Sequence, residues 1–228
     1  NNSWAAGGGR IGSFPSKGIK YRIFAAYADV NLSYYHQFDM IGEKELKFNI
    51  EAAPVFLSIS KKINRQNVYL GVQYLYSKNV LKPVFKEPVP DFISSKELDS
   101  KIGTMGTFLD FDNRNTIFTP NKGVNAHLLY TFNDNWTGSD YKFQELSGFV
   151  NGFIPIKPKW VCGLHVDVQQ AFGDVPFYIL PDIDMEGIPT ARYQGQTTLV
   201  VETEQRFDLT YRWSVVAFGG YGKTIQKN

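Results

Sequence analysis

Three histidines, His36, His127 and His165, are the first candidates for chemistry in this chain. None has a second histidine or a cysteine pair at the spacing of a zinc site, so no metal site is predicted. His165 and Asp167 are alternate residues that would share one face of a strand, where with a serine they could form a hydrolytic triad. No Gly-x-Ser-x-Gly turn presents that serine. We therefore favour a polar pair that lines a lumen and is hydrogen-bonded across strands, with a lipase as the weaker alternative.

The glycine clusters AAGGGRIG and FGGYGK do not predict a phosphate loop, because neither has a strand-loop-helix setting or a Lys-Ser/Thr partner. No cofactor is expected. Glycine inside a strand more often allows curvature or the close approach of another segment. The stretch DMEGIPTARYQGQ, residues 184–196, is a candidate for that segment, because it carries two glycines, a proline, an arginine and a tyrosine in a connection between two strands. Residues that set the backbone conformation in this way predict a loop that folds against another part of the protein.

The elements that would position these residues are β-strands. Apolar and polar residues alternate along residues 158–170, which is the pattern of a two-faced strand. Changes of phase near Ala28 and Pro54 predict bulges. About ten strands and no helix are expected, in an antiparallel meander. The expected strands cover residues 4–14, 19–35, 46–60, 67–77, 100–111, 123–133, 140–154, 158–170, 199–207 and 211–221.

Composition and connections favour a membrane barrel. Aromatic residues make up 15% of the chain, and no apolar run is long enough for a membrane helix. Short connections at FPSKG, KKINRQ and IPIKPK alternate with long ones at residues 36–45, 78–98 and 172–195, as in outer-membrane barrels. Tyr130, Phe132 and Trp160 end apolar faces, where an aromatic girdle would lie. A soluble β-sandwich or lipocalin-like barrel is the alternative.

Charge excludes one further class of partner. The net charge of +2 comes from 24 basic and 22 acidic residues without blocks, so no nucleic-acid interface is expected. The single cysteine, Cys162, lies in an apolar alternating segment and is expected to be a packing residue. A charged face such as that of Glu202, Glu204 and Arg206 would line a wet lumen.

Two motifs carry a resemblance to a known family. The turn LDFDNRNTIFTPNKG, with Asp112, Arg114, Asn115, Pro120 and Gly123, resembles a periplasmic turn in the barrel of the BamA/TamA outer-membrane assembly proteins, also called bacterial surface antigens. The stretch MEGIPTARYQGQTTLVVETEQRF resembles the inward-folded loop of that family and the strand after it. The matching residues are Gly187, Ile188, Arg192, Tyr193 and Gly195 in the loop and Glu204 and Arg206 in the strand, and the likeness covers residues 99–222.

The chain departs from the family pattern at two positions that would form a salt bridge. Glu186 stands where the family has an arginine, and Gly220 stands where it has an aspartate. Because an unpaired buried arginine is costly, the joint loss is physically consistent. We expect a replacement ion-pair network in the lumen that joins Arg192 and Arg206 to Glu186, Glu202 and Glu204.

The resemblance implies one transmembrane β-barrel domain over residues 1–228, part of a larger barrel in the bacterial outer membrane. It implies a role in outer-membrane protein assembly or polypeptide secretion, without a cofactor and without enzymatic activity. The implied partners are outer-membrane lipids, unfolded client proteins and accessory lipoproteins. A passive pore or structural barrel without insertase activity is the alternative, and a lipase is the weaker one.

Overall fold

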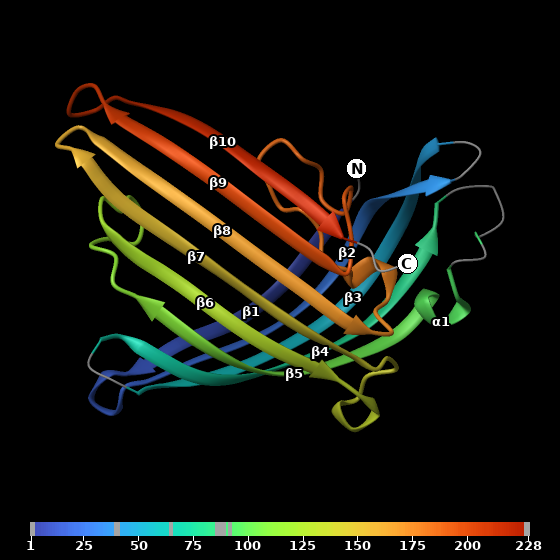
Figure 1. Cartoon of the computed structure of the whole chain (residues 1–228). Coiled ribbons are helices and arrows are strands. Elements are labelled where there is room, and N and C mark those ends of the chain that lie inside the picture. Colours follow the sequence, from blue (N-terminus) through green and yellow to red (C-terminus); the bar gives the residue numbers. More distant parts are fainter. Residues whose placement is uncertain (1–2, 39–41, 64–65, 85–89, 91–92, 226–228) are drawn as a thin grey trace.

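The protein, described from a computed structural model, is a single curved antiparallel sheet of ten strands. The structure describes residues 3–38, 42–63, 66–84, 90 and 93–225. Each strand pairs with the next one in the chain, so the prediction of an all-β meander is confirmed (Figure 1). The strands are β1 (Trp4–Phe14), β2 (Ile19–Phe38), β3 (Gly42–Lys62), β4 (Val68–Pro83), β5 (Asp99–Asp112), β6 (Gly123–Asn133), β7 (Phe143–Lys157), β8 (Trp160–Gly173), β9 (Thr197–Asp208) and β10 (Ser214–Ile225).

The alternation of side chains gives the sheet two chemically different faces. Val166 of β8 pairs with Val201 of β9 on the convex face, and the next pair, His165 with Glu202, lies on the concave face. Large apolar side chains are exposed along the convex face. A face that is apolar and exposed is what a lipid bilayer requires of a spanning sheet, while the polar concave face lines an interior.

Aromatic pairs border the apolar band on the convex face. Trp160 and Phe207 stack at one end, with ring centroids 5.4 Å apart, and Phe132 and Trp136 pack at the other, 5.2 Å apart. From Trp160 to Phe172 the strand rises through about 12 residues at ~3.3 Å each, which at a tilt of ~40° gives a band of roughly 30 Å. That height equals the thickness of a bilayer hydrocarbon core.

Strands β2, β3 and β4 extend beyond this band, and there the apolar face changes sides. On β2 the convex face passes from Ile23 to Asp29 and Asn31, while the concave face becomes apolar at Leu32 and Tyr34. The pairing of β2 with β3 skips Ala26 and Tyr27 and resumes in the same register at Ala28↔Ala52, and β3 pairs with β4 without interruption through Pro54↔Ser77. The predicted bulges at Ala28 and Pro54 are therefore wrong: the phase changes because the surroundings of each face change, with no extra residue in the strand.

The connections leave the sheet at two opposite ends, and the two longest lie at the same end. The turns after β1, β3, β7 and β9 are short and lie at one end, on the left of Figure 1, together with the turn of residues 113–122. We call this the short-connection end. The long connections after β4 and β8 lie at the opposite, long-connection end.

Two expected long connections are shorter than predicted. Strands β2 and β3 pair as far as Phe38↔Gly42, so most of residues 36–45 is strand, and residues 39–41 lie outside the described residues. Strand β4 continues to Pro83, and near this end the Lys82 side chain forms an ion pair with Glu51 of β3. The expectation of no helix is wrong for one turn, α1 (Ser95–Leu98), which is closed by a capping box between Ser94 and Glu97.

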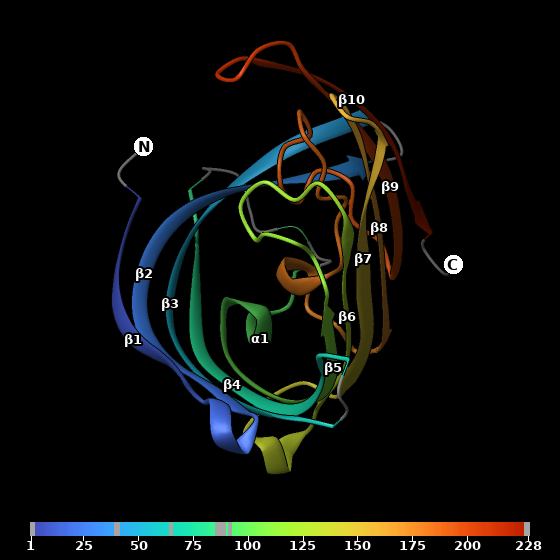
Figure 2. The same cartoon turned by 90° about the vertical axis from the view of Figure 1, so that its left-hand side faces the viewer.

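The core lies inside the curve of the sheet at the long-connection end. Figure 2 looks in from the short-connection end and shows α1 and the β8–β9 connection within the curve. The larger cluster of buried apolar residues comprises Tyr34, Leu46, Phe48, Leu81, Ile93 and Phe177. A second cluster comprises Ile102, Tyr141 and Phe143. Apolar residues on the concave face are thus buried by the connections and not by a second sheet.

Strands β1 and β10 are the two edges of the described sheet, and the pairings within the described residues do not join them to each other. No helix among the described residues is long and apolar enough to cross a membrane.

The apolar band predicts a position-dependent cost for a charge. In lipid vesicles we expect Val166→Arg, in the middle of the band on β8, to lower the free energy of unfolding by ~2–4 kcal/mol, measured by urea titration. Asn31→Arg on the convex face of β2 beyond the band is the matched control and should change it by less than ~0.5 kcal/mol. Equal effects of the two variants would contradict the placement of the band in lipid.

Candidate functional site

The β8–β9 connection, residues 174–196, forms the candidate site, because it folds into the interior of the sheet (Figure 2). It contains the 3₁₀ turn η3 (Phe177–Ile179) and then doubles back on itself. The Ile183 amide donates to the Tyr193 carbonyl at 3.0 Å, and the Gly195 amide donates to the Pro181 carbonyl at 3.0 Å. These two backbone hydrogen bonds join the two arms of the loop into a small hairpin.

An aromatic socket receives the first half of this loop. The ring of Phe177 lies edge-on to Tyr34, with centroids 4.8 Å apart, and 5.6 Å from Phe48. Both partners stand on the concave face of the extended parts of β2 and β3, where that face is apolar. Burial of an aromatic ring of this size contributes about 2–3 kcal/mol. The extension of the strands beyond the band therefore creates the surface on which the loop packs.

A buried carboxylate joins the loop to the β4–β5 connection. Glu97, 8% exposed, accepts hydrogen bonds from the Ser94 amide at 2.8 Å and from the Phe177 amide at 3.2 Å. One side chain thus caps α1 and also satisfies the start of η3. Beside it, the Tyr178 and Ser100 hydroxyls are hydrogen-bonded. Burial raises the pKa of the Tyr178 hydroxyl, so this second bond persists across the physiological pH range.

Glycines on the concave face of β10 receive the second half of the loop. A Cβ at Gly222 would lie 2.8 Å from Ile183 Cγ2 and 2.9 Å from Met185 Sδ. A Cβ at Gly220 would lie 2.5 Å from Met185 Cε. The side chains of Ile183 and Met185 therefore occupy the space that any residue larger than glycine would need at positions 220 and 222 of β10. The prediction that FGGYGK allows close approach of another segment is met by this contact.

The loop residues singled out from the sequence lie around the turn of the hairpin. Gly187 has φ 84°, a left-handed conformation that favours glycine, and the Ile188 amide closes the turn on the Met185 carbonyl at 3.1 Å. The Arg192 guanidinium lies 5.5 Å from the ring centroids of both Tyr35 and Tyr193. Gly195 is buried, and a Cβ there would lie 3.0 Å from the Ile225 carbonyl.

Glu186, Glu202 and Glu204 come together at one small hollow. It has a volume of about 160 Å³ on the concave face of β7 to β10, and its other polar side chains include Asn151 and His165. The structure thus brings the loop glutamate to the two strand glutamates, as the sequence predicts. Glu186 and Glu204 are exposed, so water can solvate these carboxylates.

The predicted ion-pair network does not hold for Arg206. Its Nε lies 3.3 Å from Asp208 Oδ1, and its Nη2 donates to Asn121 Oδ1 in the β5–β6 turn. None of the ion pairs between described residues joins Arg192 or Arg206 to the three glutamates. Glu204 and Asp208 are equally far from Arg206 along the concave face of β9, and it is Asp208, together with Asn121 of the turn, that holds the guanidinium.

The turn motif is a rigid unit at the short-connection end. Arg114 donates from Nε and Nη2 to the two carboxylate oxygens of Asp112, at 3.0 and 2.7 Å. Asn115 Oδ1 accepts the amides of residues 121 and 122. Pro120 is buried, and Gly123, at φ 109°, passes so close to Arg114 that a Cβ would lie 2.7 Å from Arg114 Cα. Figure 2 shows this turn bending inward, where Asn121 meets Arg206 of β9.

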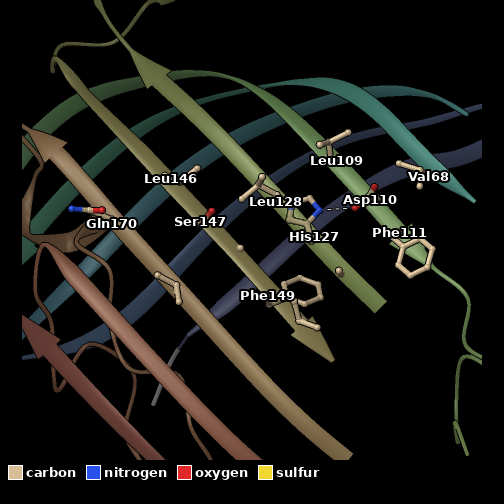
Figure 3. Close-up of a pocket in the computed structure, with 14 residues that line it drawn as sticks. Val68, Leu109, Asp110, Phe111, His127, Leu128, Leu146, Ser147, Phe149 and Gln170 are labelled. Carbon is tan, nitrogen blue, oxygen red and sulfur yellow. Dashed lines mark hydrogen bonds and ion pairs between the residues drawn. The ribbon is translucent and has the colours of Figure 1, made fainter. Parts of the chain in front are cut away.

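His165 and His127 form contacts other than the predicted one. His165 Nδ1 lies 2.7 Å from Asn151 Oδ1, and Asp167 accepts from Gln169 at 3.0 Å, so the expected His165–Asp167 pair is not formed. A second pair was not predicted from the sequence: His127 Nδ1 lies 2.5 Å from Asp110 Oδ1 across β5 and β6 (Figure 3). Only the strand register, which places Asp110 opposite His127, could have predicted it.

The convex face beside this pair is hollowed. A depression of about 490 Å³ runs over β5 to β8. Leu109, Leu128 and Leu146 line it from three consecutive strands, as Figure 3 shows. The depression forms because Ala126 and Gly148 have small side chains, and it is part of the apolar band. Among the described residues, no group of three or more His, Cys, Asp or Glu side chains is arranged to hold a metal ion.

The fold and the inward loop together define the class as an antiparallel meander of the membrane-barrel type. No protein-family model matches the sequence, and neither does any curated protein. Among solved structures, the crystal structure of BamA from Haemophilus ducreyi lacking POTRA domains 1-3 is similar, with a TM-score of 0.63 and 16% identity. The match covers 98% of this chain and 55% of that chain, so the protein spans about half the length of that structure. The fold is therefore shared with the BamA barrel.

The contact between the loop and β10 predicts a pair of opposite outcomes. Gly222→Val would place a side chain where Ile183 and Met185 lie, and overpacking costs ~1–3 kcal/mol. We expect the loop to open, with cleavage by protease at residues 184–190 accelerated about tenfold. Gly219→Val, whose added Cβ meets nothing within 4 Å, is the control and should leave the loop protected. Equal protection of the two variants would contradict the docking.

The Glu97 carboxylate predicts a second route to the same opening. Glu97→Ala leaves the Ser94 and Phe177 amides without their acceptor, at a cost of ~1–3 kcal/mol. We expect amide hydrogen exchange of residues 177–183 to accelerate about tenfold or more. Glu186→Ala removes a carboxylate exposed to solvent and serves as the control. Unchanged exchange in Glu97→Ala would show that the aromatic socket holds the loop alone.

Proposed function

We propose that this chain is the β-barrel part of a bacterial outer-membrane protein of the insertase and translocase superfamily, with a role in outer-membrane protein assembly or polypeptide secretion. The observation that carries the proposal is the β8–β9 loop, which folds into the interior and docks on the glycines of β10. It does so within a meander similar to the BamA barrel. The turn motif and the loop motif stand in the same order in the sequence as in that family.

Placement in the outer membrane is supported by the convex face. Its apolar band of roughly 30 Å is bordered by aromatic pairs, and the long connections gather at one end. On this proposal the long-connection end faces outward from the cell and the short-connection end faces the periplasm. Outer-membrane lipids are then the partners of the band.

Unfolded client proteins, with accessory lipoproteins, are the proposed partners of the interior and of the short-connection end. The chemistry needed is the pairing of strands and not the making or breaking of covalent bonds, so neither an enzyme activity nor a cofactor is part of the proposal. An extended client segment can gain main-chain hydrogen bonds by lying along a strand edge.

A passive pore is the second candidate, and the polar concave face favours it. A water-filled lumen lined by charged side chains conducts ions when it is open from end to end. In this protein the loop and α1 occupy the interior at the long-connection end, where Phe177 and Ile93 are buried in the core cluster. A large, steady conductance in planar bilayers would favour the pore over the assembly function.

The assembly function is tested with the full-length protein in liposomes. We expect an unfolded outer-membrane barrel protein, added from urea, to reach its heat-resistant folded form at least fivefold faster than in empty liposomes. Gly222→Val should lose most of this acceleration because the docked loop is displaced, whereas Gly219→Val should keep it. Equal folding rates in empty and loaded liposomes, with steady conductance in bilayers, would overturn the proposal in favour of the pore.

A further inference from the structure

A second hollow, unrelated to the loop, lies on the concave face near the short-connection end. It has a volume of about 430 Å³ between β1, β2, β3 and β5. We call it the β2 basic hollow. The side chains that carry the inference are Ser13, Lys20, Arg22, Ser58 and Ser60. Lysine, arginine and serine all offer hydrogen-bond donors, so these five lining side chains are donors and two of them are cationic.

The strand register places these donors side by side. Lys20 of β2 is opposite Ser60 of β3 and Ser13 of β1, and Arg22 is opposite Ser58. Because Lys20 and Arg22 are alternate residues, both cations point to the same concave face. Ser58 and Ser60 are buried beside them. Each cation therefore has a serine hydroxyl next to it on the neighbouring strand.

Neutral groups, and not carboxylates, hold the two cations. Arg22 Nη2 donates to Ser58 Oγ at 3.4 Å, and its Cζ lies 5.7 Å from the ring centroids of Phe56 and Phe108. Lys20 Nζ lies 3.8 Å from the ring centroid of Tyr69. Cation–π contacts orient a cation without neutralising it.

Two carboxylates lie near the cations, and each has a partner of its own. Asp110 borders the hollow and is hydrogen-bonded to His127, and Asp112, whose charge acts on Lys20, is ion-paired with Arg114. Within the described part of the chain, no ion pair to Lys20 or Arg22 lies within 4.0 Å. Two like charges on alternate residues repel each other, so an anion bound between them would remove an unfavourable interaction.

The concave wall on β7 to β9 carries more acidic than basic residues. Glu145, Asp167, Glu202 and Glu204 lie on it, and the cation Arg206, on the same face, is paired with Asp208. Figure 2 shows β7 to β9 across the interior from β1 to β3. An anion that enters the interior is repelled by that wall and attracted to the β2 basic hollow, which makes the hollow the favoured place for an anionic group.

We propose that the β2 basic hollow binds the phosphate group of a larger polar molecule, with Lys20 and Arg22 as its ligands. A phosphomonoester carries close to two negative charges at neutral pH, which balances the two cations. Arginine suits a phosphate because its planar fork donates two parallel bonds, and the serine hydroxyls can satisfy the remaining oxygens. At ~30 Å³ per water the hollow holds more than a bare phosphate ion, so the phosphate is carried on a sugar, a glycerol or a lipid headgroup.

The binding is tested with full-length protein in a neutral, phosphate-free detergent. The soluble probe is glycerol 3-phosphate, followed by isothermal titration. We expect Lys20→Gln and Arg22→Gln each to weaken its binding about tenfold or more. Lys61→Gln is the matched control. Lys61 lies opposite Ile19, the neighbour of Lys20, and points to the convex face. Its replacement should change the dissociation constant by less than about twofold. Lys20→Gln, which removes only a contact with a ring, keeps the test valid where Arg22→Gln does not fold.

A second experiment distinguishes a lipid phosphate from a soluble phosphomonoester. Protein in vesicles of phosphatidylcholine with phosphatidic acid is extracted, and retained lipid is measured by native mass spectrometry. Retention of phosphatidic acid that Lys20→Gln abolishes assigns a lipid headgroup, whereas binding of glycerol 3-phosphate alone assigns a soluble phosphomonoester. Binding of neither probe, or an equal loss in Lys61→Gln, overturns the proposal. Each outcome is independent of the client-folding assay, so failure here leaves the assembly function standing.

Discussion

The constraint on which the structure depends is that successive side chains of a strand point to opposite faces. Within the apolar band the convex face must be apolar, and the concave face is polar. Beyond the band, β2 and β3 keep their register but exchange the two environments, so that Asn31 faces outward and Tyr34 inward. That exchange supplies the apolar surface on which Phe177 packs. The height of the band and the position of the loop are therefore set by the same alternation.

The sequence was sufficient to predict the architecture where one rule held along a whole strand. The bounds of β1 and β6 agree with the prediction to the residue, because each keeps one pattern between clear turns. The ends of β2 and β3 were missed, since the polar convex face beyond the band resembles a loop when each face is assumed to keep one environment. The capping box of α1 contains too few residues to show a helical period.

Side-chain contacts between distant strands could not be predicted in the same way. Bringing Glu186 to Glu202 and Glu204 required only that the loop fold inward, and the fixed geometry around Gly187 indicated this. Pairing His165 with Asn151, or Asp110 with His127, depends on which residues face each other across a strand pair. A shift of one residue in register would exchange the faces, so composition and spacing alone cannot decide such pairs.

The replacement of an expected arginine by Glu186 changes how the loop can be held. A buried arginine would require a carboxylate partner inside the interior, with a large desolvation penalty to offset. Here the three glutamates border a small hollow in which Glu186 and Glu204 are exposed, and apolar contacts hold the loop on both sides: Ile183 and Met185 against glycines, and Phe177 against aromatic rings. Glu97, the one buried carboxylate in these contacts, is satisfied by two amides. Release of the loop from β10 and from the aromatic socket requires these apolar contacts to separate. Movement of the loop is therefore coupled to whatever displaces β10, the strand whose glycines it covers.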